Sequence, residues 1–432
     1  MDEKKKIHFI GIAGVGMSAL AQMLFREGVR VTGSDNARFP TLNAVEKLGI
    51  PVVIGYNAEN IPQDAELIVH TDAAHSDNVE RTEAVRRSIP QFSYFEMLGE
   101  VSKSKKTVAI AGTHGKTTTT GMLAKILKDA GVSPTAVIGS IVKDFGSNYL
   151  HGDSDLFVVE ACEYKDHLLE LSPQILMITN LEWDHTDFFP SLSALQETFK
   201  KAIEKAPADG FIVTNPSDKN IAPLLANAKA KIVDYTKEPA YELRLPGEFN
   251  QMNARAAAAA ARAVLPTISD SVISESLASF QGTWRRFEYK GKTANGADVY
   301  DDYAHHPTAI KETLKALRAN LRKATPCGKV YVAFHPHLYS RTRDLFEEFS
   351  NAFADADEVL IAPIYAARET DDGSVSSTML AERVNTNGTH VRAATFAEIE
   401  KIFSTEPATG DAVMTMGAGD IYKVADALVA HK

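Results

Sequence analysis

The sequence has few cysteines, no long apolar run and no excess of positive charge, and each of these shortages excludes a class of protein. Cys162 and Cys327 are the only cysteines among 432 residues and form no CxxC pair, which argues against a disulfide framework and against structural zinc. The first apolar stretch reaches glycines after a few residues, too early for a signal or membrane helix. With 46 basic and 56 acidic residues, the net charge of −10 gives no general attraction for nucleic acid or an anionic membrane. We therefore expect a cytoplasmic protein that binds anionic ligands at local sites, without a nucleic-acid partner or membrane insertion.

Strand and helix patterns alternate along the chain, which predicts an α/β protein. A chain of 432 residues, 44% of them apolar, is long enough for about three cores. Apolar runs that end in polar side chains recur from "KIHFIG" near the N-terminus to "DAVMTMGAGD" near the C-terminus, with helical stretches between them. We place domains at 1–105, 106–290 and 291–432. The polar stretch "VSKSKK" (101–106) is interpreted as a linker and the alanine-rich residues 253–265 as a helix.

The stretch "VAIAGTHGKTTTT" (108–120) predicts a phosphate-binding loop between a buried strand and a helix. Gly112 and Gly115 let backbone N–H groups approach phosphates, Lys116 reaches the outer phosphates, and the Thr117 hydroxyl is suited to Mg²⁺. The N-terminus of the following helix adds a favourable dipole. Ile110 stands where the general GxxxxGK[ST] pattern has its first glycine. The alternative is a plain glycine turn, but four consecutive threonines are poor helix formers, so nucleotide binding is the favoured interpretation.

Acidic and imidazole side chains follow two further predicted strands. Glu160 ends the run "DLFVVE", and Asn180 and His185 follow "ILMIT". Because Mg²⁺ prefers a few carboxylate oxygens together with phosphate oxygens and water, Thr117 and Glu160 form a plausible ligand pair. On chemistry alone, His185 is equally well interpreted as a loop histidine. Cys162 is interpreted as a packing residue, because nothing in the sequence predicts a lowered pKa for its thiol.

The stretch "GIAGVGMS" (11–18) is a second glycine turn after a strand, with Asp35 about 20 residues further on, as in dinucleotide-binding folds. Ala13 occupies the position of the second glycine of GxGxxG. This favours a nucleotide-diphosphate site over an NAD site, and a tight βα turn without a ligand is the structural alternative.

The last third of the chain places polar groups after strands in "YDDYAHHP" and "FHPHLYSRT". Asp302, His305 and Arg341 are candidates for a ligand site at these strand ends. The tandem Arg285 and Arg286 present two forks suited to phosphate oxygens, although surface arginines are common. The HxH pair of residues 335 and 337 has no evident third ligand, so a metal site there is not expected.

Taken together, these stretches resemble the Mur ligases, which add amino acids to peptidoglycan precursors. The resemblance spans essentially the whole chain and is most specific for the branch that joins L-alanine to UDP-N-acetylmuramate. It rests on "GIAGVGMS", "GTHGKTTT", "EACEY", "NLEWDH", "WRRFE", "DDYAHHPT" and "PHLYSRT". It implies a Rossmann-like N-terminal domain for the UDP-sugar, a central P-loop ATPase domain and a Rossmann-like C-terminal α/β domain for the amino acid. It further implies an ATP- and Mg²⁺-dependent ligase, monomeric or homodimeric, that works through an acyl phosphate.

The resemblance also implies roles for individual residues. The catalytic residues would be Lys116, Glu160, His185 and His305. The nucleotide would be held by Gly112, Thr113, Gly115, Lys116, Thr117, Thr118, Asn180, Asn250, Asn253, Arg286 and Asp302. The metal would be held by Thr117, Glu160 and His185. The UDP-sugar would be held by Gly14, Gly16, Met17, Ser18 and Asp35, and the amino acid by Tyr303, His305 and Arg341.

Three residues depart from the family pattern. Phe249 stands where a histidine is usual before the adenine-side asparagine, which would alter stacking on the nucleotide. Leu338 stands where some members have an arginine, which leaves the strictness of alanine selection open. Cys162 occupies a position that is often aspartate, which leaves the charge around Mg²⁺ open.

Three alternative functions remain at this point. The first is the recycling ligase that attaches a whole tripeptide to the same sugar nucleotide, and the "DDYAHHPT" stretch fits it equally well. The second is a dehydrogenase built on "GIAGVGMS", which leaves the phosphate loop unexplained. The third is a UDP-sugar sensor without turnover, which the presence of Lys116, Thr117 and Glu160 disfavours.

Overall fold

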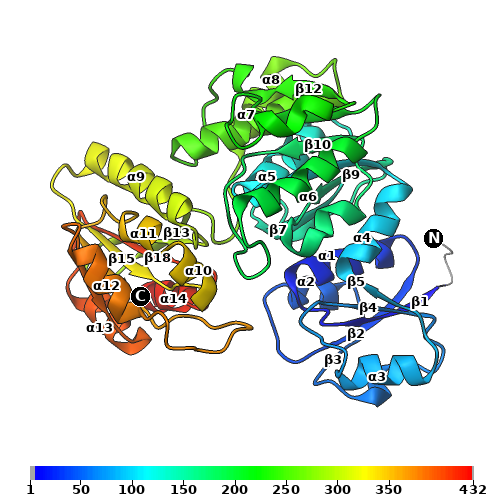
Figure 1. The fold of residues 1–432 in the computed structure, drawn as a ribbon, viewed down its shortest axis with the longest axis horizontal. Coiled ribbons are helices and arrows are strands. Elements are labelled where there is room, and N and C mark those ends of the chain that lie inside the picture. Colours follow the sequence, from blue (N-terminus) through cyan, green and yellow to red (C-terminus); the bar gives the residue numbers. More distant parts are fainter. Residues whose placement is uncertain (1–4, 431–432) are drawn as a thin grey trace. The chain divides into compact units, whose positions relative to one another are not determined.

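The computed structural model describes residues 5–430. The first four residues of the expected domain 1–105 and the last two of the expected domain 291–432 therefore lie outside the described residues. Three sheets are found in the described chain, grouped in two compact units (Figure 1). The first unit holds the first two sheets and, within the described chain, comprises residues up to Leu181 together with Leu195–Glu242 and Asn253–Gln281. The second unit holds the third sheet and comprises Glu182–Ala194, Leu243–Met252 and the described residues from Gly282 onward.

The first sheet has five parallel strands in the order β3-β2-β1-β4-β5. The strands are β1 (Lys6–Ile10), β2 (Arg30–Asp35), β3 (Val52–Ile54), β4 (Leu67–His70) and β5 (Gln91–Ser93). The helices are α1 (Val15–Arg26), α2 (Leu42–Lys47), α3 (Val79–Arg86) and α4 (Tyr94–Lys103), with a 3₁₀ helix, η1, at Ala58–Asn60. Because β1 lies between β2 and β4, the strand order reverses beside the glycine turn after β1, where such sheets bind ligands.

The expected linker at 101–106 is wrong, because α4 continues to Lys103 and β6 begins at Lys106. A capping box between Ser93 and Glu96 starts α4, and the helix then buries Val101 and Ser102. The polar composition of the stretch therefore reflects only the exposed face of a helix end, not a separate connecting segment.

The second sheet has seven strands in the order β12-β11-β10-β6-β9-β7-β8, parallel except for the β7/β8 hairpin. The strands are β6 (Lys106–Ala111), β7 (Thr135–Val142), β8 (Ser147–Leu150), β9 (Leu156–Glu160), β10 (Ile175–Ile178), β11 (Phe211–Thr214) and β12 (Lys231–Asp234). The α-helices are α5 (Lys116–Asp129), α6 (Leu192–Lys205), α7 (Glu248–Val264) and α8 (Asp270–Ser279). The 3₁₀ helices are η2 (Tyr164–Glu170), η3 (Ala222–Asn227) and η4 (Tyr235–Lys237). Since β6 is flanked by β9 and β10, the polar residues that follow these three strands gather at one edge of the sheet.

The third sheet has six strands in the order β13-β14-β18-β15-β16-β17 and is parallel except for the β13/β14 hairpin. The strands are β13 (Glu288–Lys292), β14 (Asp298–Asp302), β15 (Val330–Phe334), β16 (Glu358–Ile361), β17 (His390–Ala393) and β18 (Ala412–Met416). The helices are α9 (Pro307–Ala324), α10 (Tyr339–Asp344), α11 (Phe346–Ser350), α12 (Ser377–Asn385), α13 (Phe396–Thr405) and α14 (Tyr422–Ala430). Two separate apolar clusters form on this sheet, because the central strands direct buried residues alternately to opposite sides, as Val332 and Ala333 do.

Candidate active site

The glycine turn after β6 forms a phosphate loop whose conformation requires glycine at two positions. Gly112 and Gly115 have positive φ angles of 125° and 82°, and Gly115 is the N-cap of α5. A Cβ atom at Gly112 would lie 2.2 Å from Thr179 Oγ1, and one at Gly115 would lie 2.2 Å from Asn253 Oδ1. Asn180 supports the loop from the end of β10, since its carbonyl accepts from Thr113 N at 3.2 Å and its Oδ1 accepts from His114 N at 2.9 Å. Asn180 and Asn253, two of the residues assigned to the nucleotide by the resemblance, thus lie against this loop.

Helix α5 begins at Lys116 and includes all four threonines, which are buried. The poor helix propensity of threonine is offset here by burial, and the Thr120 hydroxyl also donates back to the Lys116 carbonyl at 2.8 Å. Thr117 and Thr118 occupy the first turn of the helix, where backbone N–H groups lack partners within the helix. The turn is therefore suited to anionic oxygens.

Lys116 has a partner that the sequence did not suggest. Its Nζ donates to Gly112 O at 2.5 Å and lies 3.0 Å from both carboxylate oxygens of Glu163, whose side chain is only 1% exposed. Burial alone would lower the pKa of Lys116, but neighbouring negative groups, Glu163 foremost, raise it above its ordinary value. The lysine therefore remains charged in a desolvated site, as binding of polyphosphate requires.

Thr117 and Glu160 meet at the ends of α5 and β9 and fit a magnesium ion. Thr117 Oγ1 donates to Glu160 Oε1 at 3.1 Å, and Gly139 N donates to Glu160 Oε2 at 2.8 Å. A hydroxyl and a carboxylate are hard oxygen ligands of the kind Mg²⁺ takes beside phosphate oxygens and water. The third expected ligand, His185, follows Asp184 at a φ of 52° and belongs to the second unit.

Cys162 lies in the sequence between Glu160 and Glu163 and is partly buried. Burial raises the pKa of Cys162 to about 12, and the negative charge of Glu163 adds to this effect. The thiol is therefore protonated at neutral pH, in keeping with its interpretation as a packing residue and not a nucleophile.

The glycine turn after β1 is shaped by Asp35 and by a tyrosine from α4. Asp35 ends β2, and its Oδ2 accepts from Ala13 N at 2.8 Å. Gly16 lies against Tyr94, since a Cβ atom at Gly16 would be 2.5 Å from Tyr94 Cζ. Gly14 is the N-cap of α1, and no side chain caps this helix start. The N–H groups of Gly11, Ile12, Ala13 and Gly14 donate within the protein, so the backbone N–H groups at the start of α1 are the ones that can serve a diphosphate.

Two further expected sugar-nucleotide residues, Met17 and Ser18, are buried in the first turns of α1. The Ser18 hydroxyl donates to Val15 O at 2.9 Å and accepts from Asn148 Nδ2 at 3.0 Å. Asn148 lies in β8 of the second sheet, so it links this sheet to the glycine turn of the first. Ser18 therefore supports the turn through its side chain, and its backbone N–H donates to the Gly14 carbonyl at 2.8 Å.

In the second unit, the two tandem arginines have different environments. Arg285 is buried, with its Nε 2.8 Å from Asp301 Oδ2 and its two terminal nitrogens donating to the carbonyls of Gly419 and Gly417. Arg286 is partly exposed and lies over the Tyr303 ring at 4.9 Å. The sequence could not separate them, but the structure gives Arg285 an anchoring role and leaves Arg286 as the phosphate candidate.

Asp302 ends β14 and is held by the backbone around it. Its Oδ2 accepts from Phe287 N at 2.6 Å and its Oδ1 from Ala304 N at 2.7 Å. Burial raises the pKa of Asp302 to about 6, while the Arg286 cation and these N–H groups oppose the shift. The carboxylate is thus fixed in place, with lone pairs remaining for a ribose hydroxyl.

The expected amino-acid residues gather around a buried ion pair. Arg341 in α10 is 2% exposed, its Nε donates to Asp184 Oδ1 at 2.7 Å, and its Nη1 lies 3.0 Å from His337 Nδ1. Over the part of the chain that the structure describes, Arg341 Nη2 has no hydrogen-bond partner, so it can receive a carboxylate. His305 Nδ1 lies 2.9 Å from the Tyr303 carbonyl, which fixes the ring beside this pair.

Burial and nearby cations keep both histidines of this cluster neutral. Burial, together with the Arg341 cation, holds the pKa of His305 well below its usual range and lowers that of His337 to about 3. Burial alone would raise the pKa of Asp184, but the Arg341 guanidinium holds it well below its usual value. The cluster therefore has one ion pair and two neutral imidazoles at neutral pH.

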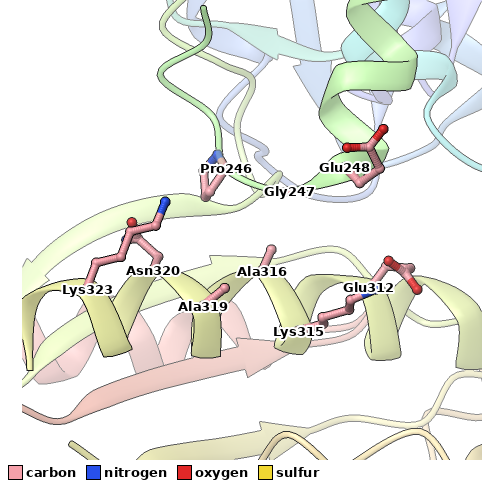
Figure 2. A pocket seen from close by; sticks show the side chains of 9 residues that line it. All are labelled: Pro246, Gly247, Glu248, Glu312, Lys315, Ala316, Ala319, Asn320 and Lys323. Atoms are coloured by element: carbon pink, nitrogen blue, oxygen red, sulfur yellow. The ribbon is translucent and has the colours of Figure 1, made fainter. Parts of the chain in front are cut away.

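The segment Pro246–Glu248 leads into α7 and lies against α9 of the second unit. Gly247 has a φ of 100°, and a Cβ atom there would lie 3.0 Å from Ala316 Cβ. Figure 2 shows this segment beside α9, with a small pocket of about 210 Å³ between them. Asn250 is buried and donates to Pro246 O at 2.7 Å, so it fastens the segment.

Two of the three departures from the family pattern have packing roles in the second unit. Phe249 packs against the apolar cluster on the α9 side of the third sheet, so its ring serves the core. Leu338 is 1% exposed, has a φ of 73° and precedes α10 as its N-cap residue.

Sequence reasoning missed three buried carboxylates: Glu163, Asp184 and Asp301. All three lie inside motifs of the sequence analysis: "EACEY", "NLEWDH" and "DDYAHHPT". The available signal was an acidic residue inside an otherwise buried stretch, which is rare unless the charge is paired.

The chain has three sheets of mostly parallel strands, and one of them has a phosphate loop beside a hydroxyl–carboxylate pair. This combination defines a nucleotide-binding enzyme of several α/β domains. The chain matches the descriptions "Mur ligase family, catalytic domain" over residues 6–106, "Mur ligase middle domain" over 110–244 and "Mur ligase, glutamate ligase domain" over 285–419. It is 39% identical to a UDP-N-acetylmuramate–L-alanine ligase of Clostridium acetobutylicum, over 98% of this chain and 97% of the relative. The chain belongs to the Mur ligase family and has its three-domain fold.

Solved structures agree with this assignment. The UDP-N-acetylmuramate–alanine ligase of Thermotoga maritima superposes with a TM-score of 0.79 at 28% identity, covering 98% of each chain. A murein peptide ligase of Psychrobacter arcticus has a TM-score of 0.71 at 24% identity over 99% of this chain and 98% of that one, which shows the shared fold. No helix within residues 5–430 is both long and apolar enough to cross a membrane.

Proposed function

We propose that the chain is an ATP-dependent ligase that joins L-alanine to the carboxylate of UDP-N-acetylmuramate, giving ADP and phosphate, in cytoplasmic peptidoglycan precursor synthesis. The observation that carries the proposal is the phosphate loop, in which a charged, partly buried Lys116 and the Thr117–Glu160 pair share one edge of the second sheet. The names of the relatives support the substrates. The domains are proposed at 1–105, 106–290 and 291–432, and the active form as a monomer or homodimer.

The reaction has two chemical steps. The muramate carboxylate attacks the γ-phosphorus of ATP, forming a carboxyl–phosphate bond and releasing ADP. The amine of L-alanine then attacks the acyl carbon, a tetrahedral intermediate collapses, and inorganic phosphate leaves as the amide forms. Both steps bring anions or poor nucleophiles together, so charge neutralisation and positioning carry most of the catalysis.

We assign roles to the residues accordingly. Lys116 neutralises charge on the outer phosphates, and backbone N–H groups at the start of α5, that of Thr118 included, donate to them. Thr113 is proposed as a further nucleotide contact from the loop, with its own N–H donating to the Asn180 carbonyl. Thr117, Glu160 and His185 would hold Mg²⁺, which supplies electrostatic stabilisation to the transferring phosphoryl group when bound. Nucleotide contacts are proposed for Asn180, Asn250, Asn253, Arg286 and Asp302.

The sugar nucleotide and the amino acid are assigned to the other two sheets. Gly14, Gly16, Met17, Ser18 and Asp35 form the proposed diphosphate turn. At the third sheet, Arg341 Nη2 is the proposed partner of the alanine carboxylate. Tyr303 and His305 are proposed to line the same site, with the His305 ring fixed by the 2.9 Å contact of its Nδ1 with the Tyr303 carbonyl. Because the pKa of His305 is held well below its usual range, the ring is a weak base, and its proposed role is to orient the amine.

Phosphate release tests the proposal. The protein is incubated with ATP, Mg²⁺ and UDP-N-acetylmuramate, and L-alanine, glycine, L-serine or the stem tripeptide is added singly. We expect release that requires both the sugar nucleotide and L-alanine. Release with the tripeptide alone would assign the recycling reaction instead, and absence of release with every acceptor would favour a sensor. The Lys116→Ala variant should lose turnover but keep its UDP-sugar affinity.

A further inference from the structure

The segment from Glu163 to Glu170, which we call the strap, connects the two binding turns of the first unit. It follows β9 and includes the 3₁₀ helix η2. Lys165 and Asp166 have φ angles of 52° and 62°, two consecutive non-glycine residues in the left-handed region. Such a backbone costs on the order of 1–3 kcal/mol per residue and persists only where its surroundings enforce it.

At its first end, the strap holds the lysine of the phosphate loop. Glu163 is almost fully buried and places both carboxylate oxygens 3.0 Å from Lys116 Nζ. The ammonium group also donates to the Gly112 and Thr113 carbonyls at 2.5 and 3.3 Å. Because a lysine side chain has four rotatable bonds, a fixed carboxylate in this position decides where its charge lies.

At its other end, the strap is fastened to the first sheet. His167 Nε2 lies 3.2 Å from Asp72 Oδ2, and Lys165 Nζ lies 3.7 Å from the same oxygen. The His167 ring stacks on Phe95 with centroids 3.7 Å apart and an interplanar angle of 14°. Asp72 follows β4, at the edge of the sheet where the glycine turn after β1 lies.

Phe95 brings the strap into contact with the sugar-nucleotide turn. It is preceded by Tyr94, whose ring meets it edge-on at 4.8 Å and fills the space above Gly16. The packed contacts thus run from Gly16 through Tyr94, Phe95 and His167 to the strap, and then through Glu163 to Lys116. All of these residues belong to the first unit.

We infer that Glu163 is a positioning residue for Lys116, and that the strap makes this positioning depend on the sugar-nucleotide turn packed against its other end. The inference rests on the proposed function for the identity of the two ligands. A coupling of this kind is reciprocal, so each ligand must change the affinity of the other by the same factor.

The first test examines positioning. Glu163→Asp keeps the charge but shortens the side chain by one methylene, and Glu170→Asp makes the same change at an exposed residue of the strap. We expect Glu163→Asp to lower kcat by up to about 100-fold, the scale for small misplacements of catalytic groups. Its melting temperature should stay near that of Glu170→Asp, which should behave as wild type. Equal kcat values in the two variants would overturn the role of Glu163.

A double-mutant cycle separates action through Lys116 from a general effect. The dissociation constant of AMP-PNP with Mg²⁺ is measured by calorimetry for wild type, Glu163→Asp, Lys116→Ala and the double variant. Glu163→Asp should weaken AMP-PNP binding in the wild-type background and leave it unchanged when Lys116 is already alanine. Additive effects would mean that Glu163 does not act through the lysine.

A third measurement tests the link to the sugar nucleotide. The AMP-PNP dissociation constant is determined with and without saturating UDP-N-acetylmuramate, in wild type and in His167→Phe, which keeps an aromatic ring on Phe95 but loses the bond to Asp72. The wild-type ratio should differ from one, and the variant ratio should move toward one. Equal ratios in both proteins, or a wild-type ratio of one, would overturn the coupling. Failure of UDP-N-acetylmuramate to bind wild type would instead refute the proposed substrate, and the cycle with AMP-PNP would still judge Glu163.

Discussion

The buried pair of Arg285 and Asp301 gives a sharp test of which tandem arginine is structural. Arg285→Ala removes the ion pair at 2.8 Å and the donors to the Gly417 and Gly419 carbonyls. It leaves the Asp301 carboxylate, 1% exposed, with the Thr415 hydroxyl at 2.6 Å as its remaining side-chain partner over residues 5–430. Removing one partner of a buried pair typically costs about 3–5 kcal/mol, because the other charge stays desolvated.

The assay uses the two tryptophans as local reporters. Trp183 and Trp284 are the only tryptophans of the chain, and both belong to the second unit. Tryptophan fluorescence during unfolding therefore follows that unit alone. For a unit of this size, the expected loss corresponds to a fall in melting temperature on the order of 10 °C.

Arg286→Ala is the matched control, because it removes the same kind of side chain at the adjacent position. Arg286 is partly exposed and its described ring contact is with Tyr303, so we expect a stability loss below about 1 kcal/mol. Its proposed phosphate role predicts a higher KM for ATP or a lower kcat. If Arg285→Ala melted within about 1 °C of wild type, a shift far below the expected one, or if both variants lost stability equally, the reasoning from burial would be refuted.

Two other predictions concern the first sheet. Burial alone would raise the pKa of Glu80, but hydrogen bonds from His8, Ser34 and other groups lower it below its ordinary value. Ionised Glu80 therefore stabilises the folded protein at pH values above the pKa of this group in the unfolded chain. This stabilisation is lost as the pH falls through the lower pKa that Glu80 has in the folded protein. Glu80→Gln should lower the free energy of unfolding by about 1–3 kcal/mol at neutral pH. In unfolding experiments followed by circular dichroism at several pH values, the variant should also lose less stability than wild type as the pH falls. An equal loss of stability at acid pH in both proteins would show that Glu80 is not its source. Gly16→Ala should raise the dissociation constant of UDP-N-acetylmuramate in calorimetry by a larger factor than that of AMP-PNP, because the added Cβ would lie 2.5 Å from Tyr94 Cζ, and equal effects on both ligands would argue against a local clash.

Much of the fold and of the nucleotide site was readable from the sequence because local rules determine it. A parallel strand buried on both faces needs an apolar run, and a phosphate loop needs glycine where φ is positive, as at Gly112 and Gly115. The apolar run and the glycines lie within a few residues of each other in the sequence. The same locality explains why the stretch "VAIAGTHGKTTTT" alone predicted the strand, loop and helix around Lys116 and Thr117.

The remaining features depend on contacts between distant parts of the chain. Glu163 and Lys116 are 47 positions apart and Asp184 and Arg341 157 apart, and no local pattern predicts which charge each will meet. Likewise, no local pattern distinguishes Arg285 from Arg286: the resemblance to the family assigned Arg286 to the nucleotide, and the structure adds that Arg285 is buried on Asp301. The polar end of α4 was mistaken for a linker because its burial depends on packing and not on composition.

The pair of Asp184 and Arg341 allows orientation and charge to be separated at the proposed amino-acid site. Asp184 engages Nε of the guanidinium through Oδ1, which fixes the plane of the fork and leaves Nη2 for a carboxylate. Asp184→Asn keeps an oxygen at this position but removes the charge, whereas Asp184→Ala removes both. Loss of the negative charge alone would strengthen the electrostatic attraction between Arg341 and a carboxylate. Loss of the hydrogen bond, in contrast, would allow the guanidinium group to rotate. Because productive attack needs the amine held near the acyl carbon, orientation should dominate. We therefore expect the KM for L-alanine in steady-state assays to rise more in Asp184→Ala than in Asp184→Asn, with the KM for ATP little changed in either. An equal rise in both variants would show that the charge of Asp184, and not the bond that orients Arg341, is what the site requires.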